Sequence, residues 1–276
     1  DNKKINVCSS LGPVVWQTYN SDGTAVLDTD ITDLSPHCWL RADAGIYTDA
    51  GKSTAATQGQ LVYTWADQAG SSFDFVQATE GNRPQWIDNT AANNRPGIVC
   101  GGDELSFTGT SSSEVGMDDY TMFWVMWIGY ADASSYYFKT SDSRFRVRAA
   151  STSQPLQMTN FGPAANYPYG STKISSASDY YEAPQIIAWR SDSTAGDQNV
   201  WVNGGTANAT IASAGSASDF ILKDGVTTDL NDNATASNPM TWYDFLLFDN
   251  SLSDAQMNTA LSYFGTKYGI TTTTLS

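Results

Sequence analysis

Three arginines at alternate positions have the spacing that most suggests binding chemistry. Arg144, Arg146 and Arg148 are two residues apart, and alternate residues of a β-strand point to one face of its sheet. A guanidinium group binds a carboxylate or phosphate through two parallel hydrogen bonds. Tyr137 and the two aromatic residues that flank it precede this segment and could stack on a sugar ring. The pattern predicts a face that binds anions or acidic glycans.

These arginines also have a second interpretation, in which they pair with the protein's own carboxylates. The chain has 29 Asp and Glu against 14 Lys and Arg, and its net charge is −15. With such an excess of acidic groups, the arginines could be neutralised within the molecule. Both interpretations stay open at the level of the sequence.

The acidic residues lack the pattern that glycoside hydrolysis needs. Retaining enzymes hold two carboxyl groups about 5–5.5 Å apart, and a Glu-x-Asp-x-Glu strand would supply them. The chain has no such triplet, and the adjacent pairs Asp103-Glu104 and Asp118-Asp119 would point to opposite faces of a strand. The only histidine, His37, precedes Cys38, and their side chains would also diverge. We therefore predict that the protein is not an enzyme and has no catalytic residue.

Two acidic loops are the only candidates for a metal ion. The segments Asp229–Asn233 and Asp192–Asp197 offer the hard oxygen ligands that Ca²⁺ prefers, although neither forms a complete EF-hand loop. No cluster of Cys and His residues suggests zinc. No other cofactor is expected.

The three cysteines, Cys8, Cys38 and Cys100, leave the disulfide pattern open. An odd number means that at least one is unpaired within the chain. A Cys8–Cys38 or Cys38–Cys100 bridge would satisfy the count equally well. The alternative is that these residues are small buried thiols.

Composition places the chain among globular proteins of an exterior surface. It has 276 residues, enough for a core without metals or disulfides, and only 16% of them are charged. Its acidic balance argues against nucleic acid and anionic membranes as partners, since phosphates are bound by clustered cations. No run of about 18 apolar residues suggests a membrane span.

Short apolar segments alternate with turn residues along most of the chain, as in an all-β protein. Two segments, Tyr120–Tyr130 and Met240–Phe248, are apolar on both faces and are expected in the middle of a covered sheet. The other predicted strands are Cys38–Asp43, Leu61–Asp67, Phe73–Gln77, Arg83–Ile87, Gly97–Gly101, Glu104–Phe107, Tyr136–Thr140, Phe145–Ala149, Pro184–Arg190, Asn199–Val202 and Asp219–Leu222.

One amphipathic helix is predicted near the C-terminus, from Ser253 to Lys267. Ser253 and Gln256 form a capping box, and Gly269 ends the helix. Lys267 in the last turn is placed to interact with the helix dipole. One face carries Met257, Ala260, Leu261, Phe264 and Tyr268, so the helix is expected to cover an apolar sheet face.

Several segments occur in an order that resembles the concanavalin A-like lectin/glucanase superfamily, in its laminin G-like form. They are His37–Ala44 (HCWLRADA), Val62–Gly70 (VYTWADQAG), Gln77–Trp86, Arg95–Phe107, Tyr120–Trp127, Ile186–Gly204 and Asp244–Ile270. The resemblance implies an antiparallel β-sandwich of jelly-roll type with one C-terminal α-helix. It implies little about activity, because lectins, adhesins, enzymes and virion proteins share this fold. Arg41 stands where the family often has Asp, and Gly101–Glu104 departs from its acidic motif.

The sequence thus predicts a non-catalytic binding or structural module, with residues 1–35 as an attachment arm and residues 36–276 as the sandwich. Display on a virion, as a phage capsid decoration, fibre or tail protein, is the first expectation. Its partners would be capsid, tail or other surface subunits bound through the arm, cell-surface glycans, and further copies of itself. A secreted bacterial carbohydrate-binding adhesin module and a glycoside hydrolase on the same fold are the alternatives.

Overall fold

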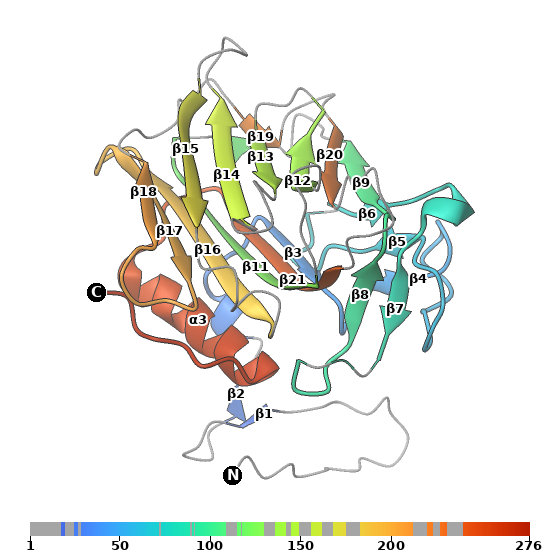
Figure 1. Ribbon diagram of the computed structural model, residues 1–276. Helices are drawn as coiled ribbons and strands as arrows, with labels where there is room; N and C mark the ends of the chain where they lie inside the picture. Colours follow the sequence, from blue (N-terminus) through green and yellow to red (C-terminus); the bar gives the residue numbers. More distant parts are fainter. Residues whose placement is uncertain are drawn as a thin grey trace.

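The chain forms two antiparallel β-sheets, and a long helix lies against the first of them (Figure 1). The computed structural model describes residues 31–71, 73–88, 90, 92–108, 115–116, 118–129, 136–141, 147–148, 183–211, 227–230 and 240–276. It describes the backbone alone for residues 18–19, 25–26, 29–30, 145–146, 156–161, 168–174 and 220–222. The all-β sandwich predicted from the sequence is confirmed.

The first sheet has eight strands in the order β18–β17–β16–β11–β21–β8–β7, and β3 also pairs with β21. Its centre is formed by the two strands predicted to be apolar on both faces. The bounds are Ala209–Ile211 for β18, Asp197–Val202 for β17, Gln185–Asp192 for β16, Tyr120–Ile128 for β11, Met240–Phe248 for β21, Gly97–Cys100 for β8, Gln85–Ile87 for β7 and Cys38–Arg41 for β3.

The second sheet has nine strands in the order β15–β14–β13–β12–β20–β9–β6–β5–β4. Neighbours along this order are antiparallel. The bounds are Pro168–Ile174 for β15, Leu156–Phe161 for β14, Phe145–Arg148 for β13, Tyr136–Thr140 for β12, Thr227–Leu230 for β20, Leu105–Thr108 for β9, Phe75–Val76 for β6, Thr64–Trp65 for β5 and Ile46–Tyr47 for β4.

Short elements complete the described part of the fold. Two small antiparallel pairs join β1 to β2 and β10 to β19. The bounds are Thr18–Tyr19 for β1, Ala25–Val26 for β2, Val115–Gly116 for β10, Phe220–Leu222 for β19, Thr29–Thr32 for helix α1 and Glu80–Asn82 for the 3-10 helix η1.

Every strand predicted from the sequence overlaps a strand of the structure. The predictions missed β4, β10, β14, β15, β18, β20 and the N-terminal pair. β14 and β15 are the longest of these, and they carry Thr, Asn, Ser and Gly among their apolar residues. Without a clear alternation they give no periodic signal, although pairing with a neighbouring strand still satisfies their backbone.

The main core lies between the two sheets and is built from aromatic side chains of both. The ring of Phe138 on β12 stacks on Phe245 of β21, with ring centroids 5.6 Å apart, and meets Trp124 of β11 at 6.3 Å. All three side chains are fully buried. Such contacts across the layers fix how the sheets face each other.

Helix α3, Asp254–Tyr268, covers the outer face of the first sheet, as predicted (Figure 1). Its capping box of Ser253 and Gln256 is present, and Gly269 ends it with φ of 69°. Phe264 meets Phe123 of β11 with ring centroids 6.0 Å apart. Ile31, which falls within the predicted arm, is buried in the same layer. Among the described helices, none is long and apolar enough to cross a membrane.

Cys38 and Cys100 are free thiols, so the Cys38–Cys100 bridge, one of the alternatives left open by the sequence, is not formed. Cys8 lies outside the described residues. Both side chains are buried in the main core, and burial raises the pKa of each above its ordinary value. The interpretation as small buried thiols holds for these two residues.

Candidate functional site

Strand β13 carries two of the three predicted arginines. The backbone pairs Arg146 with Lys139 of β12, and Arg148 with Tyr136. Val147 between them is 1% exposed and points into the core, so Arg148 belongs to the opposite, outer face of the second sheet. Arg144 lies outside the described residues. The shared face of Arg146 and Arg148 remains a prediction.

Tyr136 lies between two cations on this outer face. The Lys139 ammonium is 5.1 Å from the centroid of its ring, and the Arg148 guanidinium is 5.9 Å from it. Both distances are within the range of a cation–π attraction. All three side chains are partly exposed. We call Tyr136, Lys139 and Arg148 the basic face.

Tyr137 does not belong to the basic face, which corrects the sequence prediction. It is 1% exposed, and the neighbouring Phe138 is fully buried, so neither ring is available for stacking on a ligand. The cause is a shift in the register of β12 with β13 between Tyr136 and Phe138. Such a bulge turns two consecutive side chains towards the core and places Lys139 on the outer face with Tyr136.

One acidic residue borders the basic face. Asp229 of β20 lies opposite Lys139 in the strand register, and Ser106 of β9 follows in the same row. Asp229 is therefore a neighbouring carboxylate on this sheet for the second interpretation, in which the arginines pair within the molecule. The face combines hydrogen-bond donors, positive charge and one aromatic ring, which suits an anionic polyhydroxyl ligand.

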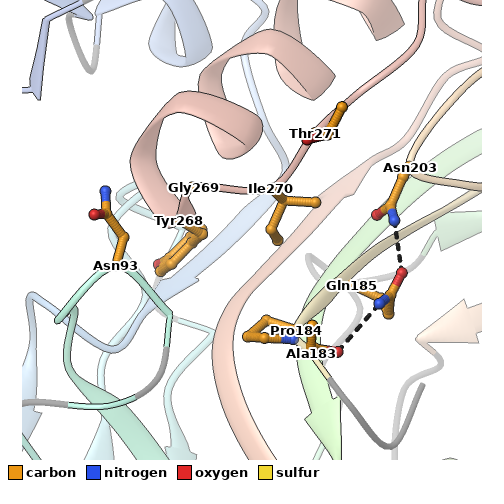
Figure 2. A pocket seen from close by; sticks show the side chains of 9 residues that line it. All are labelled: Asn93, Ala183, Pro184, Gln185, Asn203, Tyr268, Gly269, Ile270 and Thr271. Carbon is orange, nitrogen blue, oxygen red and sulfur yellow. Dashed lines mark hydrogen bonds between the residues drawn. The ribbon is translucent and has the colours of Figure 1, made fainter. Parts of the chain in front are cut away.

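A cavity of about 420 Å³ lies elsewhere, at the C-terminal end of α3. It is bordered by the loop before β8, the start of β16, the turn after β17 and the chain that follows the helix (Figure 2). Three carboxamide side chains line it, those of Asn93, Gln185 and Asn203. Sequence reasoning missed this group because the three residues are far apart in the chain and belong to no motif.

Strand β21 places a carboxylate under helix α3, next to a bulge. Val125 of β11 pairs with Asp244, but Met126 pairs with Trp242, so Tyr243 is an extra residue in β21. Tyr243 and Asp244 both lie on the helix side of the sheet, while Trp242 faces the main core. Asp244 follows the alternation of Leu246 and Phe248, which face the helix, and the bulge adds Tyr243 to that side.

Asp244 and Lys267 form a buried ion pair beneath the helix. The Lys267 ammonium donates to Asp244 at 2.9 Å and to Asp43 at 3.2 Å. The Trp39 indole nitrogen donates to the second Asp244 oxygen at 3.1 Å, and the Tyr268 hydroxyl also donates to Asp244. Lys267 is 3% exposed, so its expected role at the helix dipole is secondary to this pair. The cluster is satisfied internally and serves the fold.

Charges around the cluster shift the pKa values of its two carboxyls in opposite directions. Burial alone would raise the pKa of Asp43, but Lys267 and Arg41 outweigh it and hold that pKa well below its usual range. Arg41 contributes an ion pair to Asp43 at 2.9 Å. Asp244 is completely enclosed, and its burial raises its pKa despite Lys267.

We expect the Asp43→Asn variant to lose less stability in acid than the wild type. Because the folded pKa of Asp43 is lowered, its contribution is complete above about pH 4 and disappears as the pH falls. Asp244 acts oppositely, since a raised folded pKa gives stability that is lost as the pH rises. The measurement is the urea midpoint of unfolding of both proteins at several pH values between neutral pH and about pH 3. An equal dependence of the midpoint on pH in the variant and the wild type would contradict this assignment.

The residues considered for catalysis have structural contacts. His37 stacks on Phe73 with ring centroids 4.8 Å apart, and its Nδ1 is 3.6 Å from Asp249. Asp119 accepts hydrogen bonds from the backbone and hydroxyl groups of Ser193. Both residues therefore take part in packing and turns.

The predicted calcium loops are only partly described. Asp192 accepts hydrogen bonds from the backbone of Thr194 and Ala195, which is the role of a turn residue. Residues 231–233 of the other loop lie outside the described residues. Within the described ranges, no group of three or more His, Cys, Asp or Glu side chains could hold a metal ion.

No family model and no curated protein matches the chain. Solved structures do resemble it. One described as an HCR/D F1240A mutant aligns with a TM-score of 0.57, 10% identity, 83% of this chain and 51% of the other. The receptor-binding domain of botulinum neurotoxin D aligns with a TM-score of 0.54 and 11% identity, over 83% of this chain and 52% of the other. The ligand-binding domain of botulinum neurotoxin serotype D in complex with N-acetylneuraminic acid aligns with a TM-score of 0.52 and 11% identity, over 84% of this chain and 54% of the other.

These comparisons establish the fold of the chain. At such low identity, similarity of structure extends to the β-sandwich architecture and not to the ligands of those proteins. The chain spans about half the length of each of these structures. The laminin G-like resemblance drawn from the sequence remains a prediction.

Proposed function

We propose that this chain is a non-catalytic binding module that takes acidic saccharides on its basic face. The observation that carries the proposal is the arrangement of Tyr136 between Lys139 and Arg148. In a chain with a net charge of −15, such a concentration of cations is a local exception. A carboxylated sugar offers both an anion for the two cations and a ring face for the tyrosine.

The similar structures support a binding role by analogy of fold. One of them was solved in complex with N-acetylneuraminic acid, a sugar with a carboxylate, and another with synaptotagmin II, a protein. Display on a virion or a cell surface, with residues 1–35 as the attachment segment, is part of the same proposal. Exterior placement would bring the basic face into contact with surface glycans.

We expect the Arg148→Met variant to bind sialyllactose about tenfold more weakly than the wild type. One charge-assisted hydrogen bond contributes roughly 1.5–3 kcal/mol, and Met keeps most of the side-chain volume. The affinity is measured by calorimetry at low salt, with lactose as the neutral counterpart. Binding should also weaken as salt is added, because the face is exposed.

The matched control is Lys52→Met, which removes one cation elsewhere. Lys52 pairs with Asp74 at 2.7 Å. It lies near β4 and β6, at the end of the second sheet that is distant from β13 in the strand order. This variant should bind sialyllactose like the wild type. Equal affinities of all three proteins, or equal affinities for sialyllactose and lactose, would refute acidic-saccharide binding at the basic face.

A further inference from the structure

The cavity at the end of α3 is built from parts that hold each other in place. Asn203 accepts a hydrogen bond from the Ile186 amide at 2.9 Å and donates to Gln185 at 2.6 Å. Gln185 donates to the Ala183 carbonyl at 3.1 Å (Figure 2). A side chain fixed in this way needs no further ordering when a ligand arrives.

Asn93 fixes the opposite side of the cavity. Its amide donates to the Lys267 carbonyl at 3.3 Å, at the last turn of α3. Arg95 donates to the same carbonyl at 3.3 Å, so this helix end already has its partners. Asn93 has φ of 52°, a left-handed conformation that Asn tolerates better than most residues. The three carboxamides are thus held in place by hydrogen bonds to the backbone and, for Gln185 and Asn203, to each other.

The described residues that line the cavity suit a neutral ligand. Of the described residues that border it, none carries a charge. A carboxamide offers a donor and an acceptor side by side, which matches hydroxyl groups that both donate and accept. Pro184 and Ile270 add apolar surface, and Figure 2 shows the Ile270 side chain directed towards Pro184. The volume of about 420 Å³ falls within the range of small-molecule sites.

We propose that this cavity binds a neutral saccharide unit. The carboxamides of Gln185, Asn203 and Asn93 would hydrogen-bond its hydroxyl groups, and Ile270 and Pro184 would contact its apolar C–H surface. The site is independent of the basic face. The basic face belongs to the nine-stranded sheet, whereas the cavity lies between the eight-stranded sheet and the end of α3. The chain would then hold two kinds of sugar at two places.

The test is a titration of the full chain with N-acetylglucosamine, galactose and glucose, followed by calorimetry and by NMR of the backbone amides. At least one sugar should bind in the millimolar range and shift the resonances of residues 183–185, 203 and 268–271. Gln185→Leu should weaken that binding about tenfold, because it removes a hydrogen bond to the sugar and leaves Asn203 without its acceptor.

Two further variants keep the test decisive. Gln85→Leu is the matched control, since Gln85 donates to the Gly59 carbonyl at 2.7 Å and borders no part of the cavity. Asn93→Gly removes the third carboxamide while it preserves the left-handed backbone, and should also weaken binding. The proposal is overturned if none of the sugars binds, or if Gln185→Leu and Asn93→Gly bind like the wild type. Arg148→Met should leave this binding unchanged, which separates the result from that of the basic face.

Discussion

Replacement of Lys267 by Met is expected to lower the free energy of unfolding by about 3–5 kcal/mol, the range for loss of one partner from a buried ion pair. Asp244 is completely buried and would keep only Trp39 and Tyr268 as donors. Asp43 would lose its second cation and keep Arg41. Met has a similar length and fills the space of the lysine stem, so the loss would report the charge. Urea unfolding followed by tryptophan fluorescence measures it.

The matched control for this variant is Lys52→Met, at an exposed ion pair. Lys52 and Asp74 are 2.7 Å apart, but the Lys52 side chain is 45% exposed. Surface pairs contribute about 0–1 kcal/mol, so this variant should be nearly as stable as the wild type. The double variant Asp244→Asn/Lys267→Met should be more stable than the sum of the two single losses predicts, because it leaves no unpaired charge. Similar losses at Lys267 and Lys52 would contradict the role of burial.

Replacement of Gly204 by Ala is expected to lower the free energy of unfolding by about 3 kcal/mol. A Cβ atom at Gly204 would lie 1.9 Å from the Thr273 carbonyl oxygen, and φ there is +84°. The segment after α3 crosses this turn, where Gly205 donates to the Thr273 carbonyl and the Thr273 amide donates to Asn203, each at 2.9 Å. The alanine would strain the turn by about 1–2 kcal/mol and displace the crossing chain as well.

Gly196→Ala separates the two effects. Gly196 has φ of +74°, but nothing lies within 4 Å of a Cβ built there. This variant should therefore lose only about 1 kcal/mol from backbone strain. The segment displaced in Gly204→Ala continues from Ile270 and Thr271, which line the carboxamide cavity, so the same variant should weaken sugar binding. Equal losses of stability for the two glycine variants would show that the contact with Thr273 is unimportant.

Much of the fold can be predicted from the sequence because it depends on local patterns. The strands β11 and β21 are apolar on both faces, and they lie at the centre of a sheet covered on both sides. The capping box of Ser253 and Gln256 and the glycine after the helix define α3 within a few residues of its ends. Strands such as β14 and β15 have no such pattern and exist because a neighbour pairs with them.

The candidate sites could be predicted only in part. Alternation predicted Arg146 and Arg148 on one face of a strand, and the strand register pairs them with Lys139 and Tyr136 of β12. It failed for Tyr137, because the bulge in β12 depends on how that strand pairs with β13. It also gave no sign that Tyr243 would join Asp244 beneath the helix, because the bulge in β21 arises against β11. A bulge is set by two strands together, and the sequence of one strand does not reveal it.

The amino-acid sequence by itself determined the class of the fold, the position of the long helix and the strongly acidic charge of the chain. These follow from periodicity, capping residues and composition, all of which act between near neighbours or over the whole chain. Only the tertiary structure decided that Lys267 is buried against Asp244, that Tyr136 faces the cations, and that Asn93, Gln185 and Asn203 surround one cavity. Each of these depends on contacts between residues far apart in the chain, and strand pairing and packing alone bring those residues together.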